Sequence, residues 1–367
     1  MPPLRRPRKH NFSAGPGALP DTVLAQAAAA VEEYEDTGLS ILGLSHRTEA
    51  FEAIVAEASA NVRALLAVPP EYEILFLQGG GTLQFSMVPL HLARGRAAPP
   101  DYLRTGYWSR RAVAEAAAVV PPRVVWDGEA SGYRRLPRPD ETAYDPGAPY
   151  LHYVSNETVE GLQHRDVVGL DGVPRVCDLS SDFLARPFPV ERFALLYAHA
   201  QKNIGPAGVT VVILHRSVAE DGPRDVPALL QYRSHVAAGS IFHTPPVFAI
   251  YVVLLVTRWL LHEIGGLEAM ARINAAKAAS LYRTLDTFPN VFVPHAERAS
   301  RSDMNVSFHL ADPAGEPALV ARAEAADLHG LAGHRSVGDL RASLYNGVSP
   351  ASVDRLSAFL EEFASRA

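Results

Sequence analysis

The feature that most constrains the fold is a regular alternation of short apolar segments and helical runs between residues 73 and 214. The segments typical of strands are Glu73–Leu77, Asp101–Thr105, Arg123–Trp126, Tyr150–Ser155, Arg175–Leu179, Leu195–Ala198 and Gly208–Leu214. A helical run at Thr82–Leu92 lies between the first and second of these segments, and another at Arg110–Val119 lies between the second and third. Strands that alternate with helices of this length favour parallel pairing, so the pattern predicts an α/β fold with a mostly parallel sheet.

The character of the chain changes after Gly265–Gly266, where a long helix is expected at Leu267–Thr287 and shorter strands and helices follow. We predict a large domain of residues 20–266, and a small α+β domain of residues 267–367 together with residues 1–19. The 367 residues, 48% of them hydrophobic, suffice for a buried core in each. The most apolar stretch, Val247–Val256, is interpreted as a buried or subunit-facing helix that is too short to span a bilayer.

Charge and cysteine content restrict the partners and the compartment. The net charge of −6 provides no positive field for nucleic acid or an anionic membrane, so neither is expected as a partner. Met1–His10 is basic without a following apolar stretch, and is interpreted as a solvated tail rather than a secretory signal. Cys177 is the only cysteine, which excludes an intramolecular disulfide and fits a cytoplasmic location.

Lysine is rare in this chain. Of 34 Lys and Arg residues only Lys9, Lys202 and Lys277 are lysines, so arginine has taken almost every cationic position. An amine can lose its proton near neutral pH and become a nucleophile, whereas a guanidinium cannot. Lys202 lies in a tight loop that contains Gly205 and Gly208, at the edge of the predicted sheet. Such a lysine suits a Schiff base with a carbonyl. An ordinary loop lysine is the alternative, and Lys9 and Lys277 are interpreted as chance survivors.

Two further motifs follow predicted strands. Gly79-Gly80-Gly81-Thr82 precedes a helix, and backbone N–H groups at such a start suit a phosphate. A glycine-rich turn without a ligand is the alternative. Asp178 ends another strand 24 positions before Lys202, and a buried carboxylate there needs a positive partner. A protonated pyridine nitrogen would be one; a helix N-cap role is the other interpretation.

Aromatic and cationic residues complete the candidate set. Trp108 follows a strand and has a flat face on which a ring can stack, although core packing is the simpler interpretation. Thr158 follows another strand and could bond a ring hydroxyl. A group of cations in loops suits a doubly anionic substrate, although any one of them can be ordinary surface charge. This group consists of His46, Arg47, His334, Arg335 and Arg341.

Taken together, these segments resemble the phosphoserine aminotransferase family almost from end to end. The segments that carry the likeness are NFSAGP at 11–16, LSHR at 44–47, QGGGT at 78–82, DLSSD at 178–182, AQKNIGP at 200–206, TPP at 244–246, GHRSVG at 333–338 and SLYN at 343–346. The resemblance implies a class V, fold-type-I transferase that depends on pyridoxal 5′-phosphate, with a seven-stranded type of sheet and no metal. It also implies a homodimer whose active sites lie at the subunit interface.

The resemblance implies a role for each matching residue. Lys202 would hold the cofactor as a Schiff base, Asp178 would face the ring nitrogen, Trp108 would stack on the ring and Thr158 would lie near the ring oxygen. The cofactor phosphate would be bound by Gly81, Thr82 and Gln201, with His243 and Thr244 coming from the second subunit. Arg341 would bind the substrate α-carboxylate, and the distal anion would be bound by Arg47, His46, His334 and Arg335.

The implied reaction is transamination between L-glutamate and 3-phosphohydroxypyruvate, which gives O-phospho-L-serine and 2-oxoglutarate for serine biosynthesis. The phosphorylated hydroxythreonine precursor of pyridoxine biosynthesis would fit the same basic pocket. One alternative is a related aminotransferase that uses glyoxylate with alanine or serine. Glyoxylate has a single anion, so the residues assigned to the distal anion would then have no ligand. A cysteine desulfurase would need a mobile cysteine, and Cys177 at a strand end is badly placed for that. A non-catalytic binding protein of the same fold is the remaining alternative.

The chain departs from the family's usual residues at several positions. Thr82 stands where some members have Arg, His243 where Asn is usual, Ala14 where some have Ser, and His199 where Gly is usual. The sequence offers no reason for His199, which lies three positions before Lys202.

Overall fold

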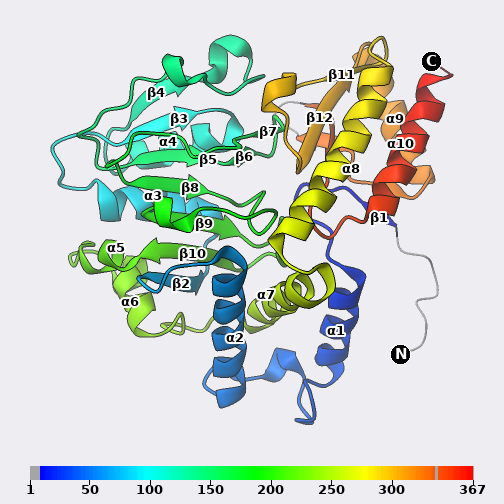
Figure 1. Ribbon diagram of the computed structural model, residues 1–367. Helices are drawn as coiled ribbons and strands as arrows, with labels where there is room; N and C mark the ends of the chain where they lie inside the picture. The colour runs from blue at the N-terminus through cyan, green and yellow to red at the C-terminus, as the bar shows by residue number, and fades with distance from the viewer. Residues whose placement is uncertain (1–8, 335–337, 367) are drawn as a thin grey trace.

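The computed structural model describes residues 9–334 and 338–366. Its centre is a seven-stranded sheet in the order β2-β10-β9-β8-β5-β3-β4 (Figure 1). The strands are β2 (Tyr72–Leu77), β3 (Asp101–Arg104), β4 (Arg123–Asp127), β5 (Leu151–Val154), β8 (Arg175–Asp178), β9 (Leu195–His199) and β10 (Thr210–His215). Only β10 runs antiparallel to its neighbours, β2 and β9. The predicted α/β fold with a mostly parallel sheet is therefore confirmed.

Successive side chains of each strand point to opposite faces of the sheet, so both faces carry apolar residues that pack against helices. Leu75, Leu77 and Tyr197 lie in a core with α3 (Gly80–Leu92) and α4 (Tyr107–Ala117). Their neighbours in sequence, such as Phe76 and Leu196, lie in the opposite core with α2 (Glu49–Leu66) and α7 (Val247–Trp259). Both faces are thus covered, and the carboxyl ends of the parallel strands are left for a site. Shorter elements flank the sheet: β6 (Asn156–Glu157), β7 (Leu162–Gln163), α5 (Arg216–Glu220) and α6 (Tyr232–Ala237).

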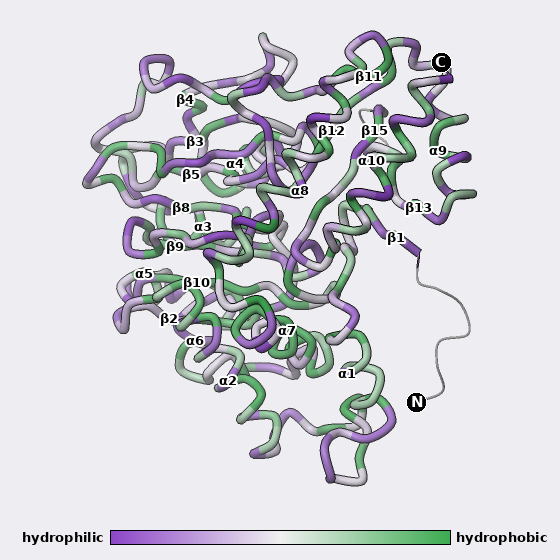
Figure 2. Tube along the Cα trace, turned by 45° about the vertical axis from the view of Figure 1, so that its right-hand side comes forward, coloured by the Kyte–Doolittle hydropathy of each residue, from purple (hydrophilic) through white to green (hydrophobic). Residues whose placement is uncertain are grey.

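The apolar helix α7 corrects one expectation from the sequence. It continues through a π-helical turn, Leu260–Ile264, so the segment Val247–Ile264 has 18 residues and is long and apolar enough to cross a membrane. The statement that it is too short was therefore wrong. Residues 249–257 of this helix are nevertheless buried, and α7 packs between α2 and α1 (Asp21–Glu32) (Figure 2). This is the packing of a core helix.

A second hydrophobic core begins after Gly265–Gly266. It is formed by α8 (Leu267–Thr287), α9 (Glu316–Ala325) and α10 (Pro350–Ala364) with an antiparallel sheet in the order β11-β12-β15-β14. The strands are β11 (Phe292–Pro294), β12 (Asn305–Leu310), β14 (Ala332–His334) and β15 (Gly338–Ser343). The start of the chain belongs to this core, because β1 (His10–Asn11) pairs with β13 (Leu328–His329) and Phe12 is fully buried in it. We propose that the domain boundary lies at Gly266, where α8 begins.

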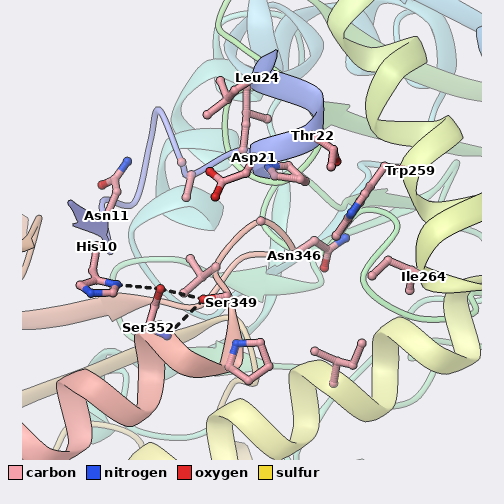
Figure 3. A pocket seen from close by; sticks show the side chains of 18 of the residues that line it. His10, Asn11, Asp21, Thr22, Leu24, Trp259, Ile264, Asn346, Ser349 and Ser352 are labelled. Atoms are coloured by element: carbon pink, nitrogen blue, oxygen red, sulfur yellow. Dashed lines mark hydrogen bonds between the residues drawn. The ribbon is translucent and has the colours of Figure 1, made fainter. Parts of the chain in front are cut away.

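A cleft of about 660 Å³ separates the two cores beside this boundary. Leu24 and Trp259 line it from α1 and α7, and Asn346 and Ser349 line it from the segment before α10 (Figure 3). A hydrogen bond of 2.9 Å between His10 Nδ1 and Ser352 Oγ ties the start of the chain to α10 at its rim. The cleft contains neither Lys202 nor Asp178, so the candidate chemistry lies elsewhere.

The position of Phe12 gives a testable prediction. Phe12→Ala should lower the free energy of unfolding by about 3–5 kcal/mol, because it empties a fully buried ring position in a core built from residues more than 260 positions away. Urea denaturation would measure the change. Leu170→Ala is the control, since this side chain is 38% exposed and should cost less than about 0.5 kcal/mol. Equal midpoints for the two variants would contradict the packing described here.

Candidate active site

The amine of Lys202 is buried in the turn between β9 and β10. The residue is 8% exposed, and Nζ donates hydrogen bonds to Thr158 Oγ1 at 2.7 Å and to Ser181 Oγ at 3.1 Å. Nζ also lies 4.7 Å from the centre of the Trp108 ring. Burial lowers the pKa of Lys202 to about 8, while the carboxylate of Asp178 acts in the opposite direction. This amine can therefore lose its proton close to neutral pH.

The turn that presents Lys202 is fixed from two sides. Gly205 packs against α7, where an added Cβ would lie 3.0 Å from a methyl group of Val253. On the other side, the N–H of Gly17 donates to the carbonyl oxygen of Gln201 at 2.7 Å. A Cβ on Gly17 would lie 2.3 Å from the carbonyl oxygen of Lys202, so only glycine fits there. The lysine is thus held on a rigid support.

Asp178 lies at the end of β8, next to β9 in the sheet. Its side chain is buried, and Oδ1 accepts the N–H of Ser180 at 2.8 Å. Burial raises the pKa of Asp178, while the ammonium of Lys202 lowers it. Its second oxygen, Oδ2, lies 3.7 Å from the point where a Cβ on Gly81 would be. The carboxylate therefore faces the start of α3.

These groups meet in a cavity of about 400 Å³. Its wall includes the first turn of α3, Trp108, Asp178, Ser180, His199, Gln201 and Lys202. Gly79 and Gly80 have φ values of 92° and 67°, which glycine adopts without strain, and no side chain caps the helix. The first N–H groups of α3 are left for a ligand, and the end of a helix that carries them favours an anion.

Arg341 and His334 lie in a neighbouring crevice rather than in this cavity. They line it together with Glu160 and Ser307. The guanidinium of Arg341 is close enough for its charge to lower the pKa of Lys202. Its Nε atom is buried and has no hydrogen-bond partner among the residues that the structure describes. An arginine in this position is available for a carboxylate that enters beside the lysine.

The remaining residues expected at the site lie outside both spaces or outside the described residues. His46 and Arg47 belong to the connection before α2, and Arg47 is exposed. His243 and Thr244 precede α7, where the carbonyl oxygen of Thr244 accepts a hydrogen bond from Gln78 at 2.8 Å. One chain thus assembles Lys202, Asp178, Gly81, Thr82, Trp108, Gln201 and, through the lysine amine, Thr158. Arg335 lies outside the described residues.

The geometry agrees with comparisons against known proteins. The model of the aminotransferase class-V family matches residues 9–356. The chain belongs to the class-V aminotransferase family. It is 44% identical to the phosphoserine aminotransferase of Laribacter hongkongensis over 97% of this chain and 99% of that protein. The relative of the same name from Geobacillus kaustophilus is 43% identical over 98% and 99%.

The solved structures to which this class-V aminotransferase is similar include two phosphoserine aminotransferases. A phosphoserine aminotransferase from Bacillus circulans subsp. alkalophilus has a TM-score of 0.95 at 42% identity, with 98% of this chain and 99% of that chain covered. A phosphoserine aminotransferase from Trichomonas vaginalis, solved with bound pyridoxal phosphate, has a TM-score of 0.90 at 34% identity and covers 96% and 100%. The fold is therefore fold-type I, and pyridoxal phosphate is the cofactor.

The described residues fit this cofactor on structural grounds. The amine of Lys202 lies 4.7 Å from the centre of the flat Trp108 ring and close enough to the buried carboxylate of Asp178 for its charge to lower the pKa of that carboxyl. An uncapped helix start that suits a phosphate forms the opposite part of the wall. A ring with one basic nitrogen, one carbonyl carbon and one phosphate matches these three features.

Sequence reasoning missed the two glutamates that hold Trp108 in place. Glu157 accepts the N–H groups of Trp108 at 3.0 Å and of Ser109 at 2.9 Å, and Glu160 accepts that of Tyr107 at 2.8 Å. Burial and the nearby carboxylate of Glu157 raise the pKa of Glu160 to about 8. Acidic groups at a helix start are favourable, but these come from about 50 positions later in the chain. No local pattern could have revealed them.

The structure also corrects the interpretation of Lys277 as a chance survivor. Its side chain is buried, and Nζ donates to the carbonyl oxygens of Leu344, Tyr345 and Val348 at 2.9, 2.9 and 3.0 Å. Burial lowers the pKa of Lys277 to about 7. Three N–H bonds from one nitrogen atom suit three converging carbonyls, whereas the planar guanidinium of arginine spreads its donors over three nitrogens. Lysine is therefore required here for its shape.

This bonding links α8 to the turn that carries Lys202. Asn274, one turn before Lys277, donates to the side-chain oxygen of Asn346 at 2.8 Å. The backbone N–H of Asn346 in turn donates to Asn203 Oδ1 at 2.8 Å, and Asn203 is the next residue after Lys202. Buried polar groups that are hydrogen-bonded to one another in this way help to fix the relative position of the segments that carry them.

The role of Lys277 can be tested by substitution. Lys277→Met should lower the free energy of unfolding by about 1–3 kcal/mol, because three buried carbonyls lose their donor. Lys277→Arg should not restore stability, although it keeps the charge. Thermal and urea denaturation would measure both. Lys9→Met is the matched control, since Lys9 is exposed and should be neutral. Wild-type stability of Lys277→Met would show that the three bonds contribute nothing.

Proposed function

We propose that this aminotransferase transfers the amino group of L-glutamate to 3-phosphohydroxypyruvate and so forms O-phospho-L-serine and 2-oxoglutarate. The observation that carries the proposal is the buried amine of Lys202, which lies 4.7 Å from the centre of the Trp108 ring and within electrostatic reach of Asp178 and Arg341. The names of the relatives at 43–44% identity over nearly the whole chain support the choice of substrate. Structures named for other transamination reactions, such as an alanine–glyoxylate aminotransferase at 17% identity, share only the fold.

The protein groups divide the chemical work. When bound, pyridoxal phosphate supplies a conjugated system that stabilises negative charge at the substrate Cα. Asp178 holds a positive charge on the ring nitrogen, which strengthens this effect. Lys202 holds the cofactor and later moves the proton from Cα as general base and then general acid. A pKa of about 8 places Lys202 near the pH at which it works, and Thr158 and Ser181 orient its amine.

The substrates explain the basic residues. Glutamate and phosphohydroxypyruvate each carry an α-carboxylate and a second anion. Arg341 can bind the α-carboxylate with two parallel hydrogen bonds. We assign the second anion to His46, Arg47, His334 and Arg335. Since burial already disfavours an unpaired charge on Arg341, an entering carboxylate is a favourable partner for it.

We further propose a homodimer in which the second subunit completes the site. His46, Arg47, His243 and Thr244 line neither the cavity of Lys202 nor the crevice of Arg341 in their own chain. The connection that carries Arg47 also exposes Leu39 and Leu42, which are 55% and 63% accessible. Exposed leucines beside functional cations support a subunit contact at this connection. The single buried Cys177 fits a cytoplasmic site of action.

Lys202→Ala should reduce transamination by at least about 100-fold, because it removes both the attachment of the cofactor and the proton carrier. A coupled assay with glutamate and phosphohydroxypyruvate measures the rate, with glyoxylate as the competing acceptor. Lys9→Ala is the control and should keep the wild-type rate, since Lys9 lies outside the cavity. Near-wild-type turnover of Lys202→Ala would refute the assignment. If the wild-type protein turned over glyoxylate faster than phosphohydroxypyruvate, the proposed amino acceptor would be wrong.

Arg341→Gln should raise KM for glutamate and for phosphohydroxypyruvate by about 10- to 100-fold, because charge-assisted hydrogen bonds to each α-carboxylate are lost. Steady-state kinetics with each substrate varied in turn would show this. Arg355→Gln, an exposed arginine on α10, is the matched control. An effect on only one of the two substrates would contradict the assignment of Arg341 to the α-carboxylate, which both substrates share.

A further inference from the structure

His199 is a residue of the cavity for which the sequence offered no role. It is the last residue of β9, on the same face of the sheet as Tyr197, which packs against α3 and α4. An added Cβ on Gly80 would lie 3.5 Å from both Nδ1 and Cε1 of the imidazole. The ring of His199 therefore lies against the first turn of α3, on the side that faces the cavity.

The first turn of α3 is where the cofactor phosphate fits, yet few positive charges surround it. Among the described residues of the chain's own cavity wall, only Lys202 and His199 can be cationic, and the one further cation assigned to the phosphate, His243, would come from the second subunit. Position 82 is a threonine, which can offer a hydroxyl hydrogen bond but no charge. With the cofactor bound, Lys202 would be occupied by the carbonyl carbon of the cofactor rather than by its phosphate. A phosphate dianion that leaves water needs a positive partner or several donors.

We propose that His199 binds the cofactor phosphate as an imidazolium and so supplies the positive charge that Thr82 lacks. The proposal rests on pyridoxal phosphate as the cofactor and is independent of the amino acceptor. A histidine at this place can donate one ring N–H to a phosphate oxygen, next to the N–H groups of α3. The geometry suits it, since the imidazole lies 3.5 Å from the point where a Cβ on Gly80 would be, against the first turn of α3.

Binding of the phosphate should change the protonation of His199. In the protein alone, burial and the charge of Lys202 lower the pKa of His199. The groups that face it are Lys202 from the turn after β9 and Asp178 from the end of β8, whereas residues 80–87 of α3 and Thr210 of β10 carry no charge. A phosphate dianion nearby stabilises the imidazolium, so binding should take up a proton. Affinity should then fall as pH rises through the pKa of the bound state.

The test uses pyridoxamine 5′-phosphate, which binds without a covalent bond to Lys202, and pyridoxamine, which lacks the phosphate. Titration calorimetry of the apoprotein in two buffers of different ionisation enthalpy gives the affinity and the protons taken up. At pH 6.5 His199→Gln should weaken pyridoxamine phosphate binding by about tenfold and abolish the proton uptake, because a charge-assisted hydrogen bond is lost. Binding of pyridoxamine should be unchanged. In the His199→Gln variant, the ³¹P resonance of bound pyridoxamine phosphate should lose the pH dependence that it shows in the wild type.

Two controls keep the outcome decisive. His199→Gly removes the side chain without adding bulk and should behave as His199→Gln does, so a folding defect of one variant does not decide the result. His309→Gln, on β12 outside the cavity, should match the wild type. Wild-type affinity and proton uptake in both His199 variants would overturn the proposal. Equal losses for pyridoxamine and its phosphate would overturn it as well, because His199 would then support the wall rather than the phosphate.

Discussion

The structure depends on keeping one amine out of water while leaving it reactive. Moving the Nζ atom of Lys202 into the interior disfavours its charged form, and this lowers its pKa to about 8. Two hydroxyls, a carboxylate and the face of an indole partly offset that cost. The balance leaves an amine that can exist in both protonation states near neutral pH. The proposed transamination requires both states, because in it the same nitrogen holds the cofactor and then carries a proton.

Such a balance requires that segments distant in sequence be held in place. Asp178 ends β8, Lys202 follows β9, and Trp108 lies in the first turn of α4, whose first N–H groups are bound by Glu157 and Glu160. The second core contributes through Asn346 and Lys277, which tie α8 to the turn after β9. A sheet with helices on both faces leaves only the ends of its strands free, and the site lies there. The rigidity of the site is thus a property of both cores together.

Much of this could be predicted from the sequence because the signal was local. Alternating apolar and helical segments gave the sheet, and the scarcity of lysine pointed to Lys202. Long-range features could not be predicted. Glu157 and Glu160 act on a helix that starts about 50 positions earlier, and Lys277 stood in an alanine-rich run with no sign of burial. The length of α7 was misjudged because Thr257 and Arg258 interrupt the apolar run, whereas the helix continues past them into a π-helical turn. The roles assigned to His46, Arg47, His243 and Thr244 stay predictions, since they depend on a second subunit.

The burial of Lys202 and Lys277 has a practical consequence for chemical labelling. These residues are 8% and 2% exposed, whereas the side chain of Lys9 is 61% exposed. A reagent that acylates accessible side-chain amines would therefore modify the folded chain at one end, through Lys9, and leave the interior untouched. A fluorophore or a solid support attached by this ordinary chemistry would sit at a single defined place, far along the chain from the reactive nitrogen. This selectivity among side chains follows from an almost complete replacement of lysine by arginine.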